Sequence, residues 1–423
     1  MARYERDRDG VIDSWEVEVD GTVIWIREGR FWRRPDGTIA GGDLDWASRP
    51  VRGLFRGIDK ERARLVEQYV RNGFALVADA AIGVARDAAM EARLVDHPDD
   101  AALHSVYADW LQQHGDARGV WASVLDGDAA LAARLCAQAE RELRLHLGVD
   151  RGPRFGWHKG LLVWCSAETA QLDNLLHHPL GSTLVDARVR LTATRAGLGV
   201  NVAEVAEVFA RHPSLRRMHL ADFELDEEAT LSFIELGDLS RLWPAVRNLQ
   251  QLVLQAGGME LGQLDLPSLR TLDIRTTALT LAELVAVVRP RPTLERLSLW
   301  FGEGQELADE VGPLLDGAAF PSLRALGLCN CAFTDQLVEQ LAHSPLLPRL
   351  HTLDLSLGTL SDEGLESMVR NQRAFAHLDE LDLHESFLSP KAAKAAARLC
   401  KRVVTTDQKP HAPPTPRYVT VGE

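Results

Sequence analysis

Histidines lie beside each other or close to carboxylates at three places in the sequence, and such groups can do acid–base or metal chemistry. The three places are His177-His178, His351 with Asp354, and Asp382-Leu383-His384-Glu385. At the first, adjacent helical side chains point apart and no carboxylate or cysteine cluster is expected beside them, so zinc binding is not predicted. At the other two, no serine or cysteine nucleophile lies in a sharp turn. We therefore expect no catalytic residue, no metal, no cofactor and a protein that is not an enzyme.

Phosphate and disulfide chemistry are not predicted either. The turn Gly302-Glu303-Gly304 is too acidic to hold a phosphate, and the sequence has no Gly-Lys-Ser or Gly-Lys-Thr loop. The five cysteines are odd in number and mostly lie in leucine-rich segments, which favours a reducing compartment over a disulfide framework. The N-terminus has no apolar signal region, and no segment approaches the roughly 18 apolar residues of a membrane span. We expect a cytoplasmic protein without a membrane segment.

The composition is that of a globular chain of about three domains, with 423 residues, 46% hydrophobic and 26% charged. The formal charge is −14 and the pI is near 5.5. Nonspecific affinity for nucleic acid depends on Lys and Arg side chains that neutralise phosphates. Any contact with nucleic acid must therefore be local.

A repeated pattern, Leu-x-x-Leu-x-Leu, determines the elements that position these residues, and it recurs between positions 184 and 388. Clean copies begin at Leu249, Leu294, Leu323, Leu350 and Leu378, and copies with one substitution begin at Leu215 and Leu269. The first leucines of the last four clean copies are 27 to 29 residues apart. The pattern and its period resemble those of leucine-rich repeat proteins, and the period of about 28 resembles the ribonuclease-inhibitor subtype.

The resemblance implies an α/β leucine-rich repeat solenoid over residues 149–404, built from units of one strand and one helix. Its first strand is expected at 161–164 and its first helix at 169–178, later helices at 334–342 and 361–370, and a last edge strand at 403–404. The run Asp362-Glu363-Gly364-Leu365 resembles the subtype's helix start, and Cys331 falls on the position that the repeat gives to Asn or Cys. The spacings of 34 and 20 residues that follow Leu215 predict irregular curvature between 215 and 294.

The repeat also assigns faces to the strand residues. Its leucines turn inward, and the positions between them line an open, concave surface. The contact candidates on that surface are basic in the early units and acidic in the late ones, with one tryptophan between. They are Arg217, Arg275, Arg296, Trp300, Asp354, Glu380 and Asp382.

The N-terminal segment 1–78 alternates like antiparallel strands and then carries an amphipathic helix pattern. Residues 14–21 (Ser-Trp-Glu-Val-Glu-Val-Asp-Gly) and 66–74 (Val-Glu-Gln-Tyr-Val-Arg-Asn-Gly-Phe) resemble the opening strand and closing helix of the WGR domain, a small α+β fold. Glu28-Gly29-Arg30 stands where that family has Trp-Gly-Arg, so the signature is degenerate. The resemblance implies a nucleic-acid contact, for which the candidates are Arg27, Arg30, Arg33 and Arg34. A solvated strand face is the other interpretation of these arginines.

Residues 79–148 are predicted to be helical throughout. Asp99 or Asp100 can cap a helix whose apolar side chains, Tyr107 and Trp110 among them, share one face. The runs at 96–100, 106–111, 114–116 and 118–119 resemble a helical module that accompanies repeat arrays in large-genome bacteria such as myxobacteria and planctomycetes. Residues 405–423 form a Pro-rich tail that is expected to be extended or disordered, either as a docking peptide or as a plain linker or strap along the surface.

The favoured function is non-enzymatic protein–protein recognition, a scaffold that binds an unknown protein partner on its concave face. Two alternatives stay open. The WGR-like domain could make the chain an adaptor or sensor for nucleic acid, or the chain could be a regulatory subunit, an inhibitor or activator, of a separate enzyme.

Overall fold

The computed structural model consists of two compact units, which are residues 1–145 with 157–161, and residues 146–156 with 162–423. The structure describes residues 2–8, 11–20, 23–33, 39–41, 49–52, 64–65, 67–69, 71–72, 75–77, 85–97, 100–116, 118–119, 136–137, 139–141, 143–144, 146–149, 152–194, 197–212, 214–223, 231–410 and 416–422. Within these ranges, no helix is both long and apolar enough to cross a membrane.

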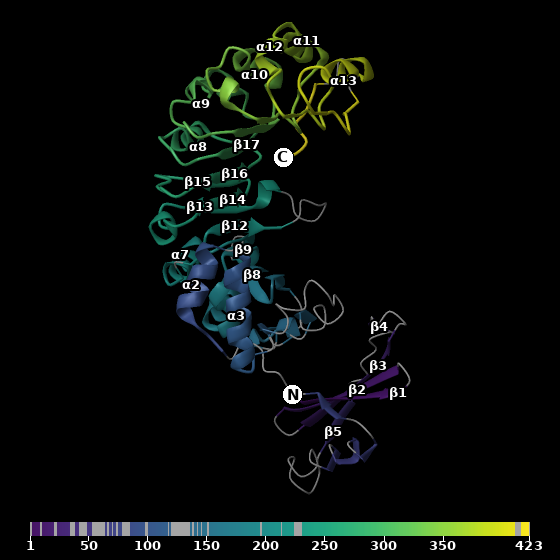
Figure 1. The fold of residues 1–423 in the computed structure, drawn as a ribbon. Helices are drawn as coiled ribbons and strands as arrows, with labels where there is room; N and C mark the ends of the chain where they lie inside the picture. The colour runs from purple at the N-terminus through teal and green to yellow at the C-terminus, as the bar shows by residue number, and fades with distance from the viewer. Residues whose placement is uncertain are drawn as a thin grey trace. The chain divides into compact units, whose positions relative to one another are not determined.

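An antiparallel sheet forms the start of the first unit (Figure 1). Its strands are β1 (Ala2–Arg8), β2 (Val11–Asp20), β3 (Val23–Arg33), β4 (Ile39–Gly41), β5 (Arg49–Arg52) and β6 (Ala75–Val77), in the order β4-β3-β2-β1-β6 with β5 also on β3. The predicted antiparallel strands are confirmed, since β2 and β3 pair from Val11–Trp32 to Asp20–Val23. Trp15 is fully buried and stacks on Tyr69, with ring centroids 3.9 Å apart.

Two capped helices, α2 (Ala88–Asp96) and α3 (Ala101–Gln113), follow in the same unit. Asp87 accepts hydrogen bonds from the first amides of α2. Asp100 accepts one from the amide of Leu103 at the start of α3, as the sequence predicts. Tyr107 belongs to the apolar core between these helices. Its hydroxyl donates to the buried Glu91, at 2.7 Å, so the ring is both a core residue and a polar anchor.

A buried ion pair closes this helical segment. Arg118 and Asp116 are both almost fully buried, with Nη2 and Oδ2 3.0 Å apart. Asp116 also accepts from the amide of Ala85, and Arg118 donates to the Ala85 carbonyl at 2.5 Å. Charges removed from water in this way need such hydrogen bonds to offset their lost hydration.

The second unit is dominated by a large, mostly parallel sheet, so the predicted α/β class is confirmed. Its strands are β7 (Arg154–His158), β8 (Leu161–Ala167), β9 (Asp186–Arg190), β12 (Arg217–Asp222), β14 (Gln251–Gln255), β16 (Thr271–Arg275), β17 (Arg296–Gly302), β18 (Ala325–Cys331), β19 (Thr352–Asp354), β20 (Glu380–Asp382) and β21 (Val403–Val404). They lie in chain order across the sheet, from β7 to β21. From β8 onward each strand pairs in parallel with the next.

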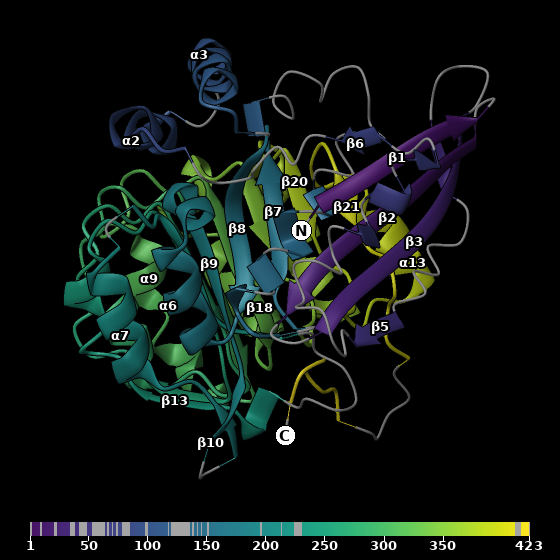
Figure 2. The ribbon, with the colours of Figure 1, turned by 90° about the horizontal axis from the view of Figure 1, so that it is seen from below.

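Helices cover one side of this sheet (Figures 1 and 2). They are α6 (Thr169–His177), α7 (Val202–Ala210), α8 (Leu281–Val287), α9 (Gly312–Asp316), α10 (Thr334–Leu341), α11 (Asp362–Arg370), α12 (Gln372–Phe375) and α13 (Pro390–Ala396). Leucines of the repeated pattern turn toward this side, and Leu297, Leu326 and Leu353 are at most 2% exposed. We call the opposite side of the sheet the open face.

The irregular spacing between 215 and 269 has a structural counterpart. Between β12 and β16 the described connections carry short 3-10 helices (Leu231–Phe233 and Trp243–Val246) and the strands β13 (Glu235–Asp238) and β15 (Gly258–Glu260). These two strands join β10 (Thr192–Thr194) and β11 (Gly197–Gly199) in a second, smaller sheet. A short strand spans fewer residues than a helix with its two loops, which is consistent with the 20-residue spacing.

The C-terminal segment packs back on the sheet. Asn330, which is fully buried, exchanges two hydrogen bonds with the backbone of Val421, at 2.6 and 2.9 Å. The amide of Thr420 donates to the Leu357 carbonyl, and Arg417 pairs with Asp335 at 2.6 Å. Of the two interpretations of the tail, the strap along the surface describes residues 416–422. Residues 411–415 lie outside the described part.

Candidate functional site

Side chains of the open face stand in rows, because parallel strands in register place equivalent residues side by side. One row runs Trp164, Asp186, Arg217, Gln251, Thr271, Arg296, Ala325, Thr352, Glu380. The next runs Ser166, Arg188, His219, Val253, Asp273, Ser298, Gly327, Asp354, Asp382. Charged residues of these rows form two groups, an early group on β9 to β17 and a late group on β19 and β20.

In and around the early group, six polar side chains form what we call the open-face cluster: Ser166, Arg188, His219, Asp222, Asp273 and Arg275. Arg188 lies over the ring of Trp164, 4.5 Å from its centroid, and its Nη2 is 3.5 Å from Asp186. A guanidinium on an indole face is held by a cation–π attraction. Burial raises the pKa of Asp186, although the charges of Arg188 and Arg217 act against the rise.

Asp222 is the centre of the contacts on β12. Its Oδ2 accepts from Ser166 Oγ and pairs with Arg154 Nη2 at 3.0 Å, and its Oδ1 is 3.3 Å from His219 Nδ1. Burial alone would raise the pKa of Asp222. The hydrogen bond from Ser166 and the charges of His219 and Arg154 outweigh that effect and lower it.

This geometry does not resemble that of a hydrolase. A serine nucleophile is activated when an imidazole stands between the hydroxyl and the carboxylate. Here the carboxylate of Asp222 stands between, since Ser166 and His219 contact its two oxygens separately. In this arrangement Asp222, and not His219, accepts the hydrogen bond of Ser166.

A second ion pair lies on β16. Arg275 donates to Asp273 Oδ2 through Nε and Nη2, at 2.9 and 2.8 Å, and its guanidinium carbon lies 5.9 Å from the centroid of Trp300. His219 Nε2 and Asp273 Oδ1 are buried polar atoms with no hydrogen-bond partner among the described residues. They stand in the same row on either side of Val253, where a bound group could satisfy both.

The late candidates form an acidic group on neighbouring strands. Asp354 and Asp382 are paired in register, and Glu380 lies two residues before Asp382 on β20. Arg402 donates to Glu380 at 2.7 Å, and His384 lies 2.9 Å from Asp382. All three carboxylates remain partly exposed.

The structure thus brings together some of the sequence candidates and separates others. Arg275 and Trp300 lie beside each other, as do Asp354, Glu380 and Asp382. Arg217 and Arg296 belong to one row of the open face, and both are exposed.

Seven residues of the site are missing from the sequence candidates: Trp164, Ser166, Asp186, Arg188, His219, Asp222 and Asp273. Trp164, Asp186, Arg188 and Asp222 lie on β8, β9 and at the end of β12, where the sequence has no complete copy of the leucine pattern. The alternation of Ala187 and Val189 with charged residues is the signal that could have identified β9.

Of the four candidate arginines in the N-terminal segment, only Arg30 has a described side chain. It is 64% exposed and pairs with Asp13 at 2.7 Å. Glu28, which precedes Gly29 and Arg30 on β3, accepts a hydrogen bond from the hydroxyl of Tyr69. Arg34 and the side chains of Arg27 and Arg33 lie outside the described residues.

The neutrality of His219 predicts a pH effect on stability. Burial lowers the pKa of His219 from its usual 6.5 to about 4, against the charge of Asp222. Between those pH values the unfolded chain binds a proton that the folded chain does not, so stability falls as pH drops from 6.5 to 4. At about 1.4 kcal/mol per pKa unit, reduced by solvent screening, we expect this group to contribute a loss on the order of 1–2 kcal/mol.

The measurement is urea unfolding at pH 7, 5.5 and 4.5 for the wild type and for His219→Gln, which cannot titrate. The stability difference between the two proteins should change over this range, with the wild type losing more. His343→Gln, at an exposed histidine, is the matched control. Parallel pH curves for wild type and His219→Gln would contradict the prediction.

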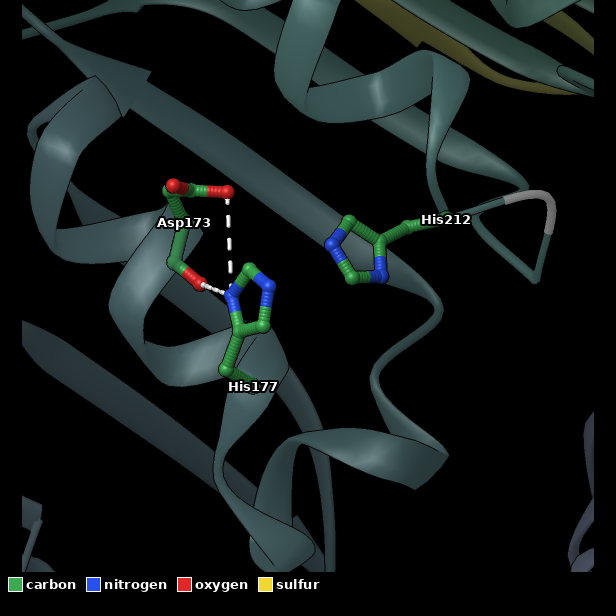
Figure 3. A group of neighbouring side chains, drawn as sticks. All are labelled: Asp173, His177 and His212. Atoms are coloured by element: carbon green, nitrogen blue, oxygen red, sulfur yellow. Dashed lines mark hydrogen bonds and ion pairs between the residues drawn. The ribbon is translucent and has the colours of Figure 1, made fainter.

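A group of three side chains on the helix side could hold a metal ion. Asp173, His177 and His212 have ligand atoms within 4.8 Å of one another (Figure 3). The expectation that no carboxylate lies beside His177 was wrong, because Asp173 is one helical turn earlier on α6. Its sequence signal is the Asp-x-x-x-His spacing.

The two neighbouring thiols on β18 are less suited to metal. Cys329 and Cys331 are buried on β18, and burial raises the pKa of the Cys331 thiol to about 12. A thiol needs to lose its proton to bind metal, so these two remain neutral core residues at physiological pH.

No protein-family model matches the chain, and no curated protein does. Among solved structures, it is similar to the crystal structure of a protein from Bacteroides fragilis that was a structural genomics target. The two share 16% sequence identity over 100% of this chain and 99% of that chain, with a TM-score of 0.55. At this identity the likeness concerns the fold alone.

Proposed function

We propose that this chain is a leucine-rich repeat protein of the bacterial cytoplasm, and that it recognises a protein partner through its open face without catalysing a reaction. The observation that supports this most is the in-register arrangement of polar side chains across the parallel strands. Consecutive units of strand and helix leave the other side of the sheet available for a large contact.

The character of the open face favours a protein over a nucleic acid. Its early part carries Arg188 and Arg275, each next to a carboxylate and a partly exposed tryptophan ring. Its late part carries only acidic candidates, which would repel phosphates. A partner with an acidic or polar segment near Trp300 and a basic segment near Asp354 would be complementary to both parts.

We propose the WGR-like fold for residues 1–78, with a structural role for its altered signature. The hydrogen bond from Tyr69 to Glu28 joins the signature strand to the closing helix segment, and the stacking of Trp15 on Tyr69 adds to that contact. Arg30 is engaged with Asp13. These contacts support a stabilising role for the altered signature, and nucleic-acid binding is our second candidate for this domain.

The experiment is recovery of a partner from the source organism with the immobilised full chain, identified by cross-linking at the open face. Arg296→Glu with Trp300→Ala should reduce recovery of that partner by on the order of tenfold or more, because buried Trp and Arg are typical interface hot spots. The matched control is Arg370→Glu with Val369→Ala, an exposed pair on α11.

Equal recovery by the open-face variant and the wild type would show that the partner binds elsewhere. If the recovered partner is an enzyme, its activity with and without this chain tests the regulatory-subunit alternative.

A further inference from the structure

The group formed by Asp173, His177 and His212 joins two consecutive helical connections between strands of the large sheet. Asp173 and His177 lie on α6, between β8 and β9, and His212 follows α7, between β9 and β12. The oxygen and nitrogen atoms that these side chains offer lie within 4.8 Å of one another. Figure 3 shows all three side chains turned toward a common space.

The hydrogen bonds fix which atoms are available. His177 Nδ1 donates to the backbone carbonyl of Asp173 at 2.7 Å, which leaves Nε2 as the nitrogen with a lone pair. Histidines that bind metal commonly orient their rings through such a bond from the other nitrogen. His212 Nε2 is buried and has no hydrogen-bond partner among the described residues. In Figure 3 one nitrogen of the His212 ring points toward Asp173 and His177.

We propose that Asp173, His177 and His212 bind one divalent transition-metal ion, for which Zn²⁺ is the best match to two imidazoles and one carboxylate. Three protein ligands leave a fourth tetrahedral position for water. The ion would connect α6 to the segment after α7, and so hold two neighbouring units together at the helix side.

One prediction specific to this site concerns the effect of Arg211 on metal binding. Its Nη2 lies 3.0 Å from Asp173 Oδ1, so its guanidinium competes with a metal ion for the same carboxylate. The Arg211 side chain is 53% exposed and can move into solvent when the ion binds. Removing this charge should therefore strengthen metal binding.

A second pair of histidines supplies a matched control. The rings of His146 and His178 are 4.7 Å apart, in the same unit of the structure. His178 Nδ1 accepts from the amide of Leu180 and His146 Nε2 contacts the Asn174 carbonyl, so both rings are engaged with the backbone.

The test is titration of the metal-stripped, tag-free full chain with Zn²⁺ against a chromophoric chelator. His177→Gln, His212→Gln and Asp173→Asn should each weaken the tightest Zn²⁺ site by on the order of tenfold or more. His146→Gln should leave it unchanged, and Arg211→Gln should strengthen it several-fold. Circular dichroism of each variant checks that it is folded, and the shift of its melting temperature on adding Zn²⁺ gives a second readout.

Wild-type Zn²⁺ affinity and an unchanged thermal shift in folded His177→Gln and His212→Gln would overturn the proposal. An unchanged or weaker affinity in Arg211→Gln would overturn the assignment of Asp173 as a ligand.

Discussion

Replacing Leu353 by alanine is expected to lower the free energy of unfolding by about 2–5 kcal/mol. Leu353 is 1% exposed and lies in register between Leu326 on β18 and Leu381 on β20, both also buried. The substitution removes apolar contacts and leaves a cavity that neighbouring strands, which are bonded on both sides, cannot close fully. Urea unfolding followed by circular dichroism measures the loss.

The same substitution at Leu281 is the control, since that side chain at the start of α8 is 47% exposed. Leu281→Ala should change the free energy of unfolding by less than about 1 kcal/mol. A similar effect of the two substitutions would mean that the leucines of the sheet are not its core.

Replacing Gly302 by alanine is expected to cost about 2–4 kcal/mol, from two sources. Gly302 ends β17 with φ +66°, a left-handed conformation that costs other residues about 1–2 kcal/mol. A Cβ there would also lie 1.5 Å from the Thr277 carbonyl oxygen, so the backbone must move. Thermal and urea unfolding of Gly302→Ala against the wild type measure the sum.

Two other glycines separate the sources. Gly237 has φ +63° with open space around its Cβ position, so Gly237→Ala should show the conformational cost alone. Gly312 begins α9 with open space and without a positive φ, so Gly312→Ala should be neutral or stabilising by up to about 1 kcal/mol. If Gly302→Ala costs no more than Gly237→Ala, the close approach of Thr277 is not what requires glycine.

Strands of the large sheet could be predicted from sequence where the leucine pattern is complete. The pattern locates β14 and β16 to β20, because a leucine at alternate positions reflects the side of the strand that is buried. The edge strand at Val403–Val404 is confirmed as β21. The strand expected at 161–164 is confirmed as part of β8 (Leu161–Ala167). On β9, Ala187 occupies an inward position, and such a small residue leaves no leucine signal.

Side-chain partners could not be predicted in the same way. Strand alternation places Arg275 and Trp300 on one face, and the structure puts them side by side. Strand alternation does not indicate that Asp222 contacts Ser166, His219 and Arg154, because those three residues come from three different strands. His212 lies beside His177 because α6 and the segment after α7 are neighbours in the fold. The two histidines are 35 residues apart along the chain, a separation that spacing rules do not cover.

The strap formed by residues 416–422 bears on the order in which this unit assembles. Within the large sheet, every strand from β9 onward pairs with the strand of that sheet that precedes it in the chain, so the sheet can grow while the chain leaves the ribosome. The bonds between Asn330 and Val421 span 91 residues and must wait until β19, β20 and β21 have been made. Docking of this segment is therefore a late step of biosynthesis, and a nascent chain that stalls after β21 would expose the buried amide of Asn330.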